Sequence, residues 1–366
     1  MPDYLFIILL ATNLFFLGIT IYNYYSAPVI RIIDNHVEVN KKISVLIPAR
    51  NEENNIGECL DSIASQDYSN LEIIVLDDNS NDSTAQIVQE YSRNNPRIKL
   101  INGEPLPDGW LGKNWACMQL SRKATGDILL FIDADVRLNN DAIKYSVKIF
   151  QYNKIKMLSV FPSQLITSLG TQLIIPMMNW ILITFLPLKK VYSSKNNSFV
   201  AANGQFIMID KNTYESFGGH ESVKHEIVED MAIAKKVKGN GSKIITALGG
   251  QEIFCKMYDS FVESINGFSK NFFPGFKMSG FFFVMMLLLF QFIFLLPIVM
   301  IFIDLKYLII IPAMILQRVY VSAISNQKIL MNVLLHPLQM IMIFFVGLNS
   351  IYVSKIKSIK WKGRTL

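Results

Sequence analysis

The chain has 366 residues, of which 51% are hydrophobic and only 17% are charged, and its formal net charge is +6. A soluble domain has about 25% charged residues, so this composition argues against a fully soluble enzyme and against intrinsic disorder. The weak positive charge suits a surface that contacts anionic lipid or phosphate. The three cysteines lack metal-binding spacing and exclude a disulfide framework, which favours a reducing, cytosolic setting for the polar part.

Long uncharged runs lie near the two ends of the sequence. Tyr4–Tyr25 has spanning length and lacks a basic start and a clear small-residue cleavage site, so we predict a retained membrane anchor over residues 1–26. Phe281–Ile303 is a second uncharged run of spanning length, and Ile329–Val353 is a third long apolar run. We therefore expect transmembrane or interfacial helices over residues 281–354.

The distribution of basic residues predicts an orientation. Lys and Arg are enriched in cytoplasmic segments, which places Lys41, Lys42 and the basic tail, residues 355–366, in the cytoplasm. Three full C-terminal spans would put that tail outside, so one run must not cross. We expect Leu305–Ile324 to be re-entrant or interfacial, because its Arg318 is costly in lipid. The prediction is a multi-pass cell-membrane protein whose polar domain is cytoplasmic.

The polar part, residues 27–280, alternates between short apolar strands and amphipathic helices. The expected strands are Ile43–Pro48, Leu71–Leu76, Ile98–Ile101 and Asp127–Ile132, and the expected helices are Asn54–Ser65, Thr84–Arg93 and Lys113–Ala124. This alternation predicts right-handed βαβ units and an α/β fold with a mostly parallel sheet.

One apolar segment interrupts the polar part at about residues 157–188. It is broken by Pro162, Pro176 and Pro187 and contains Trp180. Two interpretations stay open: an amphipathic segment at the membrane surface, or ordinary core. The first would give a lipid a path from the bilayer to the polar domain.

Polar clusters follow three of the predicted strands. Arg50-Asn51-Glu52 follows the first strand, Asp77-Asp78 the second, and Asp133-Ala134-Asp135 the fourth. In parallel sheets, ligands bind beyond the carboxyl ends of the strands. Two close carboxylates repel each other unless a cation lies near them, and Mg²⁺ or Mn²⁺ prefers few carboxylates together with waters and phosphates. The last cluster therefore predicts a metal–diphosphate site, against the alternative of a strand-ending turn.

Three further groups have both a functional and a structural interpretation. Asp77 and Asp78 offer carboxylates to sugar hydroxyls or to a base N–H, and we expect one of them to be structural. Lys113 follows a glycine at a predicted helix start, where it either faces phosphate or lies exposed on a turn. Glu229 and Asp230 either supply a base that deprotonates a hydroxyl nucleophile or mark a charged helix N-terminus.

In order and spacing, these residues resemble glycosyltransferase family 2, whose members have the GT-A fold. The resemblance runs from Ile43 to about Phe273. Its motifs are Pro48-Ala49-Arg50-Asn51-Glu52, Asp77-Asp78-Asn79-Ser80-Asn81-Asp82, Asp133-Ala134-Asp135, Ala202-Asn203-Gly204, Phe217-Gly218-Gly219-His220-Glu221 and Glu229-Asp230. Within the family, the sequence looks most like membrane-bound bacterial lipid glycosyltransferases of the carotenoid-acid (4,4'-diaponeurosporenoate) and hopanoid-associated groups.

The resemblance implies which residues hold the nucleotide. Pro48, Ala49 and Glu52 match positions that line the nucleotide site. Asp78, with Asp77, matches the position that contacts uracil or ribose. The implied donor is a UDP-sugar, with glucose as the expected sugar.

The resemblance also implies the reacting groups. Asp133 would lie at the ribose and diphosphate, and Asp135, with Asp133 beside it, would bind Mg²⁺ or Mn²⁺. Asp230, next to Glu229, matches the catalytic base, and Lys113 is our candidate for a phosphate contact. The implied reaction is an inverting, metal-dependent transfer of the sugar to a membrane lipid acceptor, such as a carotenoid acid or another terpenoid or glycolipid. No nucleic-acid partner is expected.

One departure from the family pattern bears on the reaction. Many processive or ceramide-type relatives carry Gln-x-x-Arg-Trp after the base, whereas this chain has Asn266–Asn271, where Lys270 is the only cation. Lys lacks the fork geometry of Arg, so a processive polymer synthase is disfavoured.

Two other functions remain as alternatives. A polyprenyl-phosphate sugar transferase would need a basic pocket for its anionic acceptor, and Lys189, Lys190 and Lys195 are the candidates. An inactive membrane scaffold that keeps the fold would be expected to have lost the Asp-x-Asp or Glu-Asp carboxylates, and both pairs are present.

Overall fold

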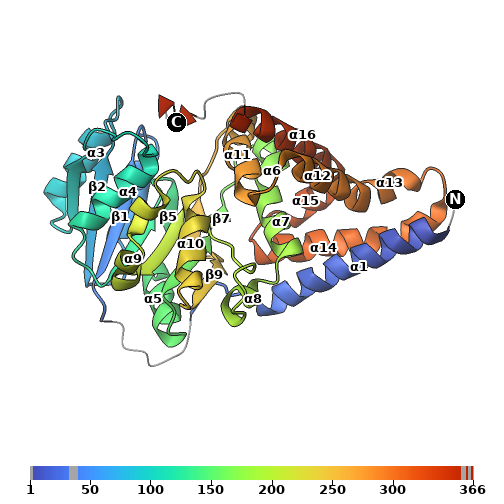
Figure 1. Cartoon of the computed structure of the whole chain (residues 1–366), viewed down its shortest axis with the longest axis horizontal. Helices are drawn as coiled ribbons and strands as arrows, with labels where there is room; N and C mark the ends of the chain where they lie inside the picture. Colours follow the sequence, from blue (N-terminus) through green and yellow to red (C-terminus); the bar gives the residue numbers. More distant parts are fainter. Residues whose placement is uncertain (1–2, 33–39, 356–359, 362–363, 366) are drawn as a thin grey trace. The chain divides into compact units, whose positions relative to one another are not determined.

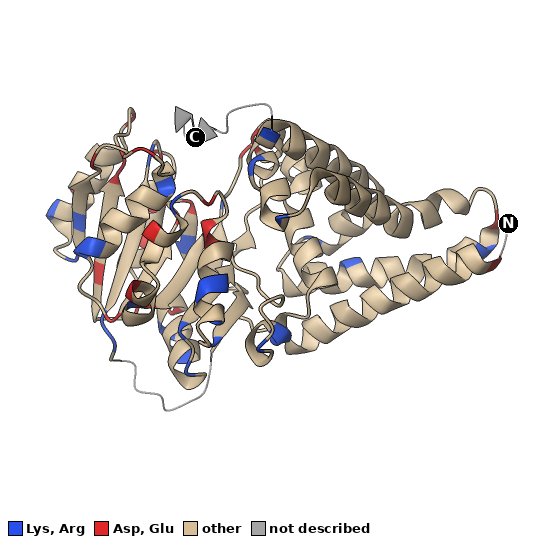
Figure 2. Ribbon diagram, in the orientation of Figure 1, with Lys and Arg blue, Asp and Glu red and all other residues tan. Residues whose placement is uncertain are grey.

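The computed structural model describes residues 3–32, 40–355, 360–361 and 364–365, and the chain divides into two compact units. The helical unit comprises Met1–Ala27, Gln164–Lys189 and Met257–Ile359. The sheet unit comprises Pro28–Ser163 and Lys190–Lys256, with Lys360–Leu366. Figure 2 shows that most charged residues belong to the sheet unit and that the long helices of the helical unit carry few. Our expectation of one polar domain over 27–280 did not foresee that residues 164–189 and 257–280 pack with the helical unit.

A seven-stranded sheet with the order β3-β2-β1-β4-β8-β6-β9 forms the core of the sheet unit (Figure 1). Its strands are β1 (Ile43–Ala49), β2 (Leu71–Asp77), β3 (Ile98–Asn102), β4 (Ile128–Ile132), β6 (Met157–Phe161), β8 (Phe206–Asp210) and β9 (Ile244–Leu248). Strands β3, β2, β1 and β4 run parallel, β8 is antiparallel to both β4 and β6, and β9 is parallel to β6. The prediction of an α/β fold with a mostly parallel sheet is confirmed.

The inner strands are apolar throughout because helices cover the sheet. Every residue of β1, β2 and β4 is buried, as expected for parallel strands enclosed on both faces. The covering helices include α2 (Ile56–Ala64), α3 (Thr84–Asn94), α4 (Gly112–Lys123), α5 (Ala142–Tyr152) and α10 (Glu229–Gly239). The first three start within two residues of their predicted positions.

Short elements complete the sheet unit. Strand β5 (Val136–Leu138) pairs antiparallel with β10 (Ile253–Cys255), and β7 (Ser163–Gln164) follows β6. The remaining helices are α8 (Leu188–Ser193), α9 (Lys211–Ser216) and the 3₁₀ helix η1 (Gly219–Val223). The amphipathic interpretation of residues 157–188 is wrong for its first part, because Met157–Phe161 is a fully buried strand inside the sheet.

The helical unit is built from apolar helices that pack on one another. They are α1 (Asp3–Ser26), α6 (Leu169–Ile174), α7 (Pro176–Phe185), α11 (Phe261–Phe276), α12 (Gly280–Phe294), α13 (Leu296–Met300), η2 (Leu305–Ile309), α14 (Ile311–Ile324), α15 (Ile329–Leu334) and α16 (His336–Lys355). Trp180 on α7 is fully buried, so the core interpretation holds for that side chain. Beyond the helices, β11 (Lys360–Trp361) pairs with β12 (Arg364–Thr365), and Lys357 and Lys362 of the expected basic tail lie outside the described residues.

Among the described residues, three helical stretches are long and apolar enough to cross a membrane: Asp3–Ser26, Leu305–Ile324 and His336–Lys355. A fourth arises if α11 and α12, which bend by 111° at their junction, count as one span. The single run expected over Phe281–Ile303 is divided between α12 and α13. Arg318 on α14 is buried, with its Nε donating to His336 Nδ1 at 2.6 Å.

Contacts inside the helical unit show which helix ends lie together. Lys306 Nζ, in η2, lies 2.9 Å from Asp3 Oδ1 at the start of α1. At the other end of these helices, the rings of Tyr24 and Tyr320 have centroids 5.0 Å apart. Helices α1 and α14 therefore run parallel.

Helix α12 runs in the opposite direction to α1. Asn13 Nδ2 donates to the carbonyl of Ile293, 3.0 Å away, near the end of α12, and Met300, further along the chain, packs in one cluster with Leu9, which is nearer the start of α1. Helix α16 returns alongside α12, since a Cβ atom at Gly280 would lie 3.2 Å from Lys355 Nζ. His336, the first residue of α16, hydrogen-bonds the last residue of α12. The C-terminal end of α16 and the start of α12 are thus at the same end of the bundle as the end of α1.

Candidate functional site

The carboxyl ends of β1 and β2 bring their polar clusters together. Asp78 N–H donates to the carbonyl of Ala49 at 2.8 Å. Arg50 donates to the Asp78 carbonyl, and its Nη1 lies 3.9 Å from Asp78 Oδ2. The side chain of Asp77 accepts from Ser80 N–H at 3.3 Å through Oδ2, whereas its buried Oδ1 has no partner among the described residues. Of the two aspartates, Asp77 thus keeps one carboxylate oxygen without a partner among the described residues, and Asp78 contacts Arg50.

The other residues expected to hold the nucleotide lie at the same edge. Pro48 and Ala49 are the last residues of β1, paired in register with Leu76 and Asp77. Glu52 N–H donates to Thr84 Oγ1 at 2.8 Å, at the start of α3. The sheet therefore brings together the residues that the sequence assigned to one site.

Asp133, Ala134 and Asp135 form a turn directly after β4. Asp133 N–H donates to the carbonyl of Gln205 at 3.2 Å, and the Asp135 carbonyl accepts from Lys256 N–H at 3.0 Å. Burial, followed by the charges of Asp133 and Glu52, raises the pKa of Asp135 to about 7. Its buried Oδ1 has no partner in the described part of the chain.

The donor set for a cation is small. Over residues 3–32, 40–355, 360–361 and 364–365, no group of three or more His, Cys, Asp or Glu side chains is assembled to hold a metal ion. The two carboxylates of the turn, with the unpartnered oxygen of Asp135, fit the small donor set that Mg²⁺ or Mn²⁺ uses when substrate phosphates and waters complete its coordination.

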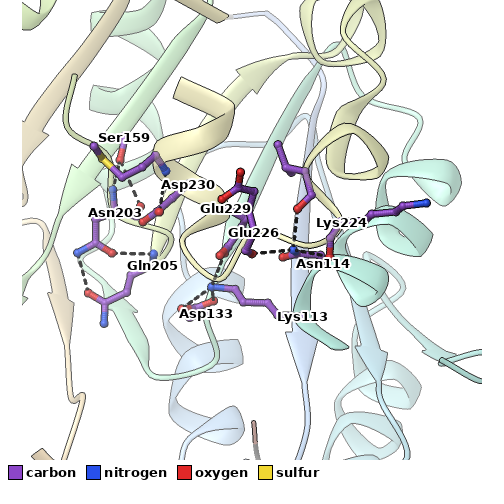
Figure 3. Close-up of polar contacts among 12 residues, drawn as sticks. Lys113, Asn114, Asp133, Ser159, Asn203, Gln205, Lys224, Glu226, Glu229 and Asp230 are labelled. Atoms are coloured by element: carbon purple, nitrogen blue, oxygen red, sulfur yellow. Dashed lines mark hydrogen bonds and ion pairs between the residues drawn. The ribbon is translucent and has the colours of Figure 1, made fainter. Parts of the chain in front are cut away.

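Lys113 connects the turn after β4 with the start of α10 (Figure 3). Its Nζ lies 2.8 Å from Asp133 Oδ1 and 3.2 Å from Glu229 Oε1. Burial alone would lower the pKa of Lys113, but the charges of Asp133 and Glu229 outweigh it and hold that pKa well above its usual value. The interpretation as an exposed turn residue is wrong, because Lys113 makes two ion pairs inside the site.

Glu229 and Asp230 are the first two residues of α10, so the interpretation as a helix start is correct, and the interpretation as a base stays a prediction. They mark a helix N-terminus, and they also lie beside Lys113. Asp230 Oδ1 accepts from Met231 N–H at 2.7 Å, and the Gly204 N–H also donates to this carboxylate. Burial and the neighbouring Glu229 raise the pKa of Asp230 to about 7, which suits a base that works near neutral pH.

Asn114 holds the loop that leads into α10. Its Nδ2 donates to the carbonyls of Val223, Lys224 and Glu226 at 3.1, 3.2 and 3.0 Å (Figure 3). Because Asn114 directly follows Lys113 on α4, one helix start places the ammonium and fixes the loop that carries the carboxylate pair. The sequence pattern gave Asn114 no role.

His220 is a buried structural residue that packs against β4. It is buried, its Nδ1 lies 2.7 Å from the Tyr214 hydroxyl, and its ring packs on Phe131 of β4. Burial, with a contribution from Lys113, lowers its pKa to about 3. The imidazole is therefore neutral and structural at physiological pH.

The segment Asn203-Gly204-Gln205 lies immediately before β8; Asn203 and Gly204 were named from the sequence only as part of a family motif, without a role, and Gln205 was not named. Asn203 N–H donates to Ser159 Oγ at 2.7 Å, and Gln205 N–H donates to Asn203 Oδ1 at 2.9 Å (Figure 3). A Cβ atom at Gly204 would lie 3.1 Å from Lys113 Nζ and 3.2 Å from an oxygen of Glu229. The backbone therefore closely approaches the charged cluster, and an alanine here would need the ends of the Lys113 and Glu229 side chains to shift by a few tenths of an ångström. The sequence signal for this part of the site is a glycine between two amide residues, directly before an apolar strand.

The sheet unit has a GT-A-like α/β fold. The solved mannosyltransferase PcManGT from Pyrobaculum calidifontis, in complex with GDP-Man and Mn²⁺, shares the fold with a TM-score of 0.59 at 16% identity over 98% of each chain. Residues 44–207 match Glycosyl transferase family 2. This part of the chain is therefore a glycosyltransferase family 2 domain, as the motifs indicated.

Curated relatives narrow the resemblance. The 4,4'-diaponeurosporenoate glycosyltransferase of Staphylococcus haemolyticus (strain JCSC1435) is 30% identical over 244 residues, and that of Staphylococcus aureus (strain USA300) is 27% identical over 242 residues. Each match covers 64% of this chain and 62% of the relative. The chain thus matches less than two thirds of the length of these relatives. The resemblance to the diaponeurosporenoate group is confirmed.

Proposed function

We propose that this protein is an inverting glycosyltransferase that moves a sugar from a nucleotide diphosphate to a membrane lipid. The observation that carries the proposal is the position of Lys113, whose ammonium joins Asp133 on the predicted donor side to Glu229 beside the predicted base. A single cluster of side chains then contains the carboxylate of Asp133, on the side of the donor diphosphate, and the proposed base. Glycosyl transfer needs both groups. An inactive scaffold has no need for buried carboxylates of this kind, since burying charge is unfavourable.

The donor is proposed to be a UDP-sugar held at the ends of β1 and β2. Pro48, Ala49 and Glu52 line the nucleotide site, and Asp77 with Asp78 recognises the base or ribose. The unpartnered Asp77 Oδ1 is an acceptor for a base N–H or a ribose hydroxyl. PcManGT was solved with GDP-Man. The assay below therefore compares donors that differ in their nucleobase and in their sugar.

A divalent cation is proposed to bind at the turn after β4. Asp135, through its unpartnered Oδ1, and Asp133 would hold Mg²⁺ or Mn²⁺. When bound, the cation would supply stabilisation of the charge that develops on the departing diphosphate. Lys113 already contacts Asp133 and is placed to add a second positive charge there, which offsets the absence of the Gln-x-x-Arg-Trp motif. The alternative cation, Lys270, lies in α11 of the helical unit.

Asp230 is proposed to act as the base. Its carboxylate takes the proton of the acceptor hydroxyl while the acceptor oxygen forms a bond to the anomeric carbon. The bond from that carbon to the diphosphate oxygen breaks on the opposite face, so the nucleoside diphosphate leaves and the configuration inverts. Glu229 stays paired with Lys113 and raises the pKa of Asp230 through its charge. A carboxylic-acid acceptor is already ionised and needs little from the base.

The acceptor is proposed to be a terpenoid lipid such as a carotenoid acid. The relatives named above are 4,4'-diaponeurosporenoate glycosyltransferases, and the candidate membrane helices of this chain support a location in the bilayer, where such a lipid dissolves. Glucose is the sugar we expect to be transferred.

The membrane topology is proposed from the helix ends. An N-terminus outside places the end of α1 in the cytoplasm, and α14, which is parallel to α1, crosses in the same direction. Helices α12 and α13 cross between them. Helix α16 begins beside the end of α12 and finishes at the cytoplasmic end, so α15 and α16 form a re-entrant pair. In this assignment the segment that does not cross is α15–α16 and not Leu305–Ile324. The sheet unit and the tail are still proposed to lie in the cytoplasm.

A polyprenyl-phosphate acceptor is the second candidate. Lys189, Lys190 and Lys195 are exposed and form no ion pair among the described residues, so none of them is neutralised by a carboxylate there. Lys190 Nζ lies 5.2 Å from the centroid of the Phe199 ring. The two candidates differ in the charge of the acceptor head group, so fractionated lipid extracts separate them.

The test uses membranes that contain the full chain, incubated with radiolabelled UDP-glucose or GDP-mannose and lipid extracts, with and without Mg²⁺ or Mn²⁺. Label in a neutral or carboxylated terpenoid fraction supports the proposal, and label in a polyprenyl-phosphate fraction supports the second candidate. No transfer and no release of nucleotide with any donor would mean that the scaffold interpretation is correct. Asp135→Asn and Asp230→Asn should abolish transfer, and the exposed Asp67→Asn is the matched control.

A further inference from the structure

Asp135 is held by a strand that the proposed mechanism does not use. Strand β10 lies antiparallel to β5, with Cys255 opposite Val136. The next residue, Lys256, donates its N–H to the Asp135 carbonyl at 3.0 Å. The backbone of the proposed metal-binding residue is therefore fixed from β10 as well as from β4.

The side chain of Cys255 contacts the carboxylate itself. The thiol is fully buried and donates a hydrogen bond to the side chain of Asp135. Asp135 Oδ1 has no partner among the residues described. Gln205 Nε2 donates to Cys255 Sγ at 2.9 Å. Because the sulfur accepts from Gln205, the S–H of the thiol stays available to donate to the carboxylate.

We propose that Cys255, oriented by Gln205, is a positioning residue that holds one oxygen of Asp135 so that the other is presented to a divalent cation. This inference rests on the proposed function. Groups that hydrogen-bond to a metal-binding carboxylate fix its rotamer, and their removal typically weakens metal binding or activity about 10- to 100-fold. A buried thiol with a defined donor and a defined acceptor can do this, although a thiol is a weak donor.

Gln205 links the relay, defined as the hydrogen bonds from Gln205 to Cys255 and from Cys255 to Asp135, to the rest of the site. Its backbone carbonyl accepts from Asp133 N–H at 3.2 Å, while its side chain donates to Cys255. One residue at the start of β8 therefore acts on both carboxylates of the turn, directly on Asp133 and through sulfur on Asp135. At the preceding Gly204, an added Cβ atom would lie 3.1 Å from Lys113 Nζ and 3.2 Å from Glu229 Oε1, so this short segment lies close to both the proposed metal-binding turn and the proposed base.

The test is Mn²⁺ binding to the full chain in detergent with UDP present, followed by the electron paramagnetic resonance signal of free Mn²⁺. Cys255→Ala should weaken Mn²⁺ binding about 10- to 100-fold, and Cys255→Ser, which keeps a donor, should remain within about threefold of wild type. The matched control is Cys117→Ala, which removes a second buried thiol for which the described part of the chain shows no hydrogen bond to a carboxylate. A purely structural role would lower the melting temperature without separating the Ser variant from the Ala variant.

Gln205→Leu provides a second route if Cys255→Ala proves too unstable to purify. It leaves the thiol in place, removes its orientation, and should weaken Mn²⁺ binding in the same direction by a smaller factor. Unchanged Mn²⁺ binding in both Cys255→Ala and Gln205→Leu, with wild type binding normally, overturns this inference and leaves the proposed function intact. If wild type transfers sugar but binds no Mn²⁺ or Mg²⁺, both the relay and the metal part of the proposed function are wrong.

Discussion

Replacing Lys113 with methionine is the most informative single substitution, because the ammonium compensates two carboxylates at once. At 2.8 and 3.2 Å, the gross attractions are about 6 and about 5 kcal/mol at an effective dielectric constant of about 20. Desolvation cancels much of this, and breaking a buried pair leaves a net loss of about 3–5 kcal/mol. Because the side chains of Lys113 and Asp133 are 23% and 27% exposed, we take about 3 kcal/mol. For a unit of about 200 residues this lowers Tm by about 6–12 °C.

The assay is thermal unfolding of the full chain in detergent at pH 8, followed by tryptophan fluorescence. The control is Lys144→Met, which removes an exposed ion pair to Asp67 and should move Tm by less than about 2 °C. A shift that small for Lys113→Met would refute the reasoning.

Three further predictions concern activity. With a hydroxyl acceptor, turnover should rise as pH increases through about 7, because the raised pKa of Asp230 leaves the base protonated below that value; a profile unchanged in Asp230→Asn would exclude it as the base. Asp135→Asn should remove stimulation of transfer by Mg²⁺ or Mn²⁺ in a metal titration, and retained stimulation would place the cation elsewhere. Gly204→Ala should lower kcat at least about tenfold with little change in donor KM, since its Cβ would lie 3.1 Å from Lys113 Nζ and small displacements of reacting groups are expensive; unchanged kcat would show that the segment tolerates the shift.

The sequence predicted well what depends on local pattern. Strands β1, β2 and β4 are continuous apolar runs followed by polar residues, so their buried positions and the meeting of Asp77, Asp133 and Asp135 at one edge followed from periodicity and the geometry of parallel sheets. Asp230 and Glu229 came from the family resemblance, since adjacent acids alone favour a helix start.

What the sequence did not predict depends on contacts between distant residues. Met157–Phe161 is an apolar run followed by a proline, and only its pairing with β8 and β9 shows that it is a strand. Cys255 meets Asp135 because a short strand pairs with β5 over more than a hundred residues of sequence. The break between α12 and α13 does not interrupt the apolar composition of Phe281–Ile303, so hydropathy did not reveal it.

The ammonium of Lys113 has a consequence for the protein without ligands. An enzyme whose site consists only of clustered carboxylates depends on a cation from solution to relieve their repulsion. Here the neutralising charge is covalently part of the chain, between Asp133 and Glu229. The folded site should therefore survive complete removal of divalent ions: a chelator is expected to stop transfer while leaving the melting temperature nearly unchanged, and activity should return when the ion is restored. Such tolerance suits an enzyme that binds its metal ion and its nucleotide together and has neither of them bound during part of each catalytic cycle.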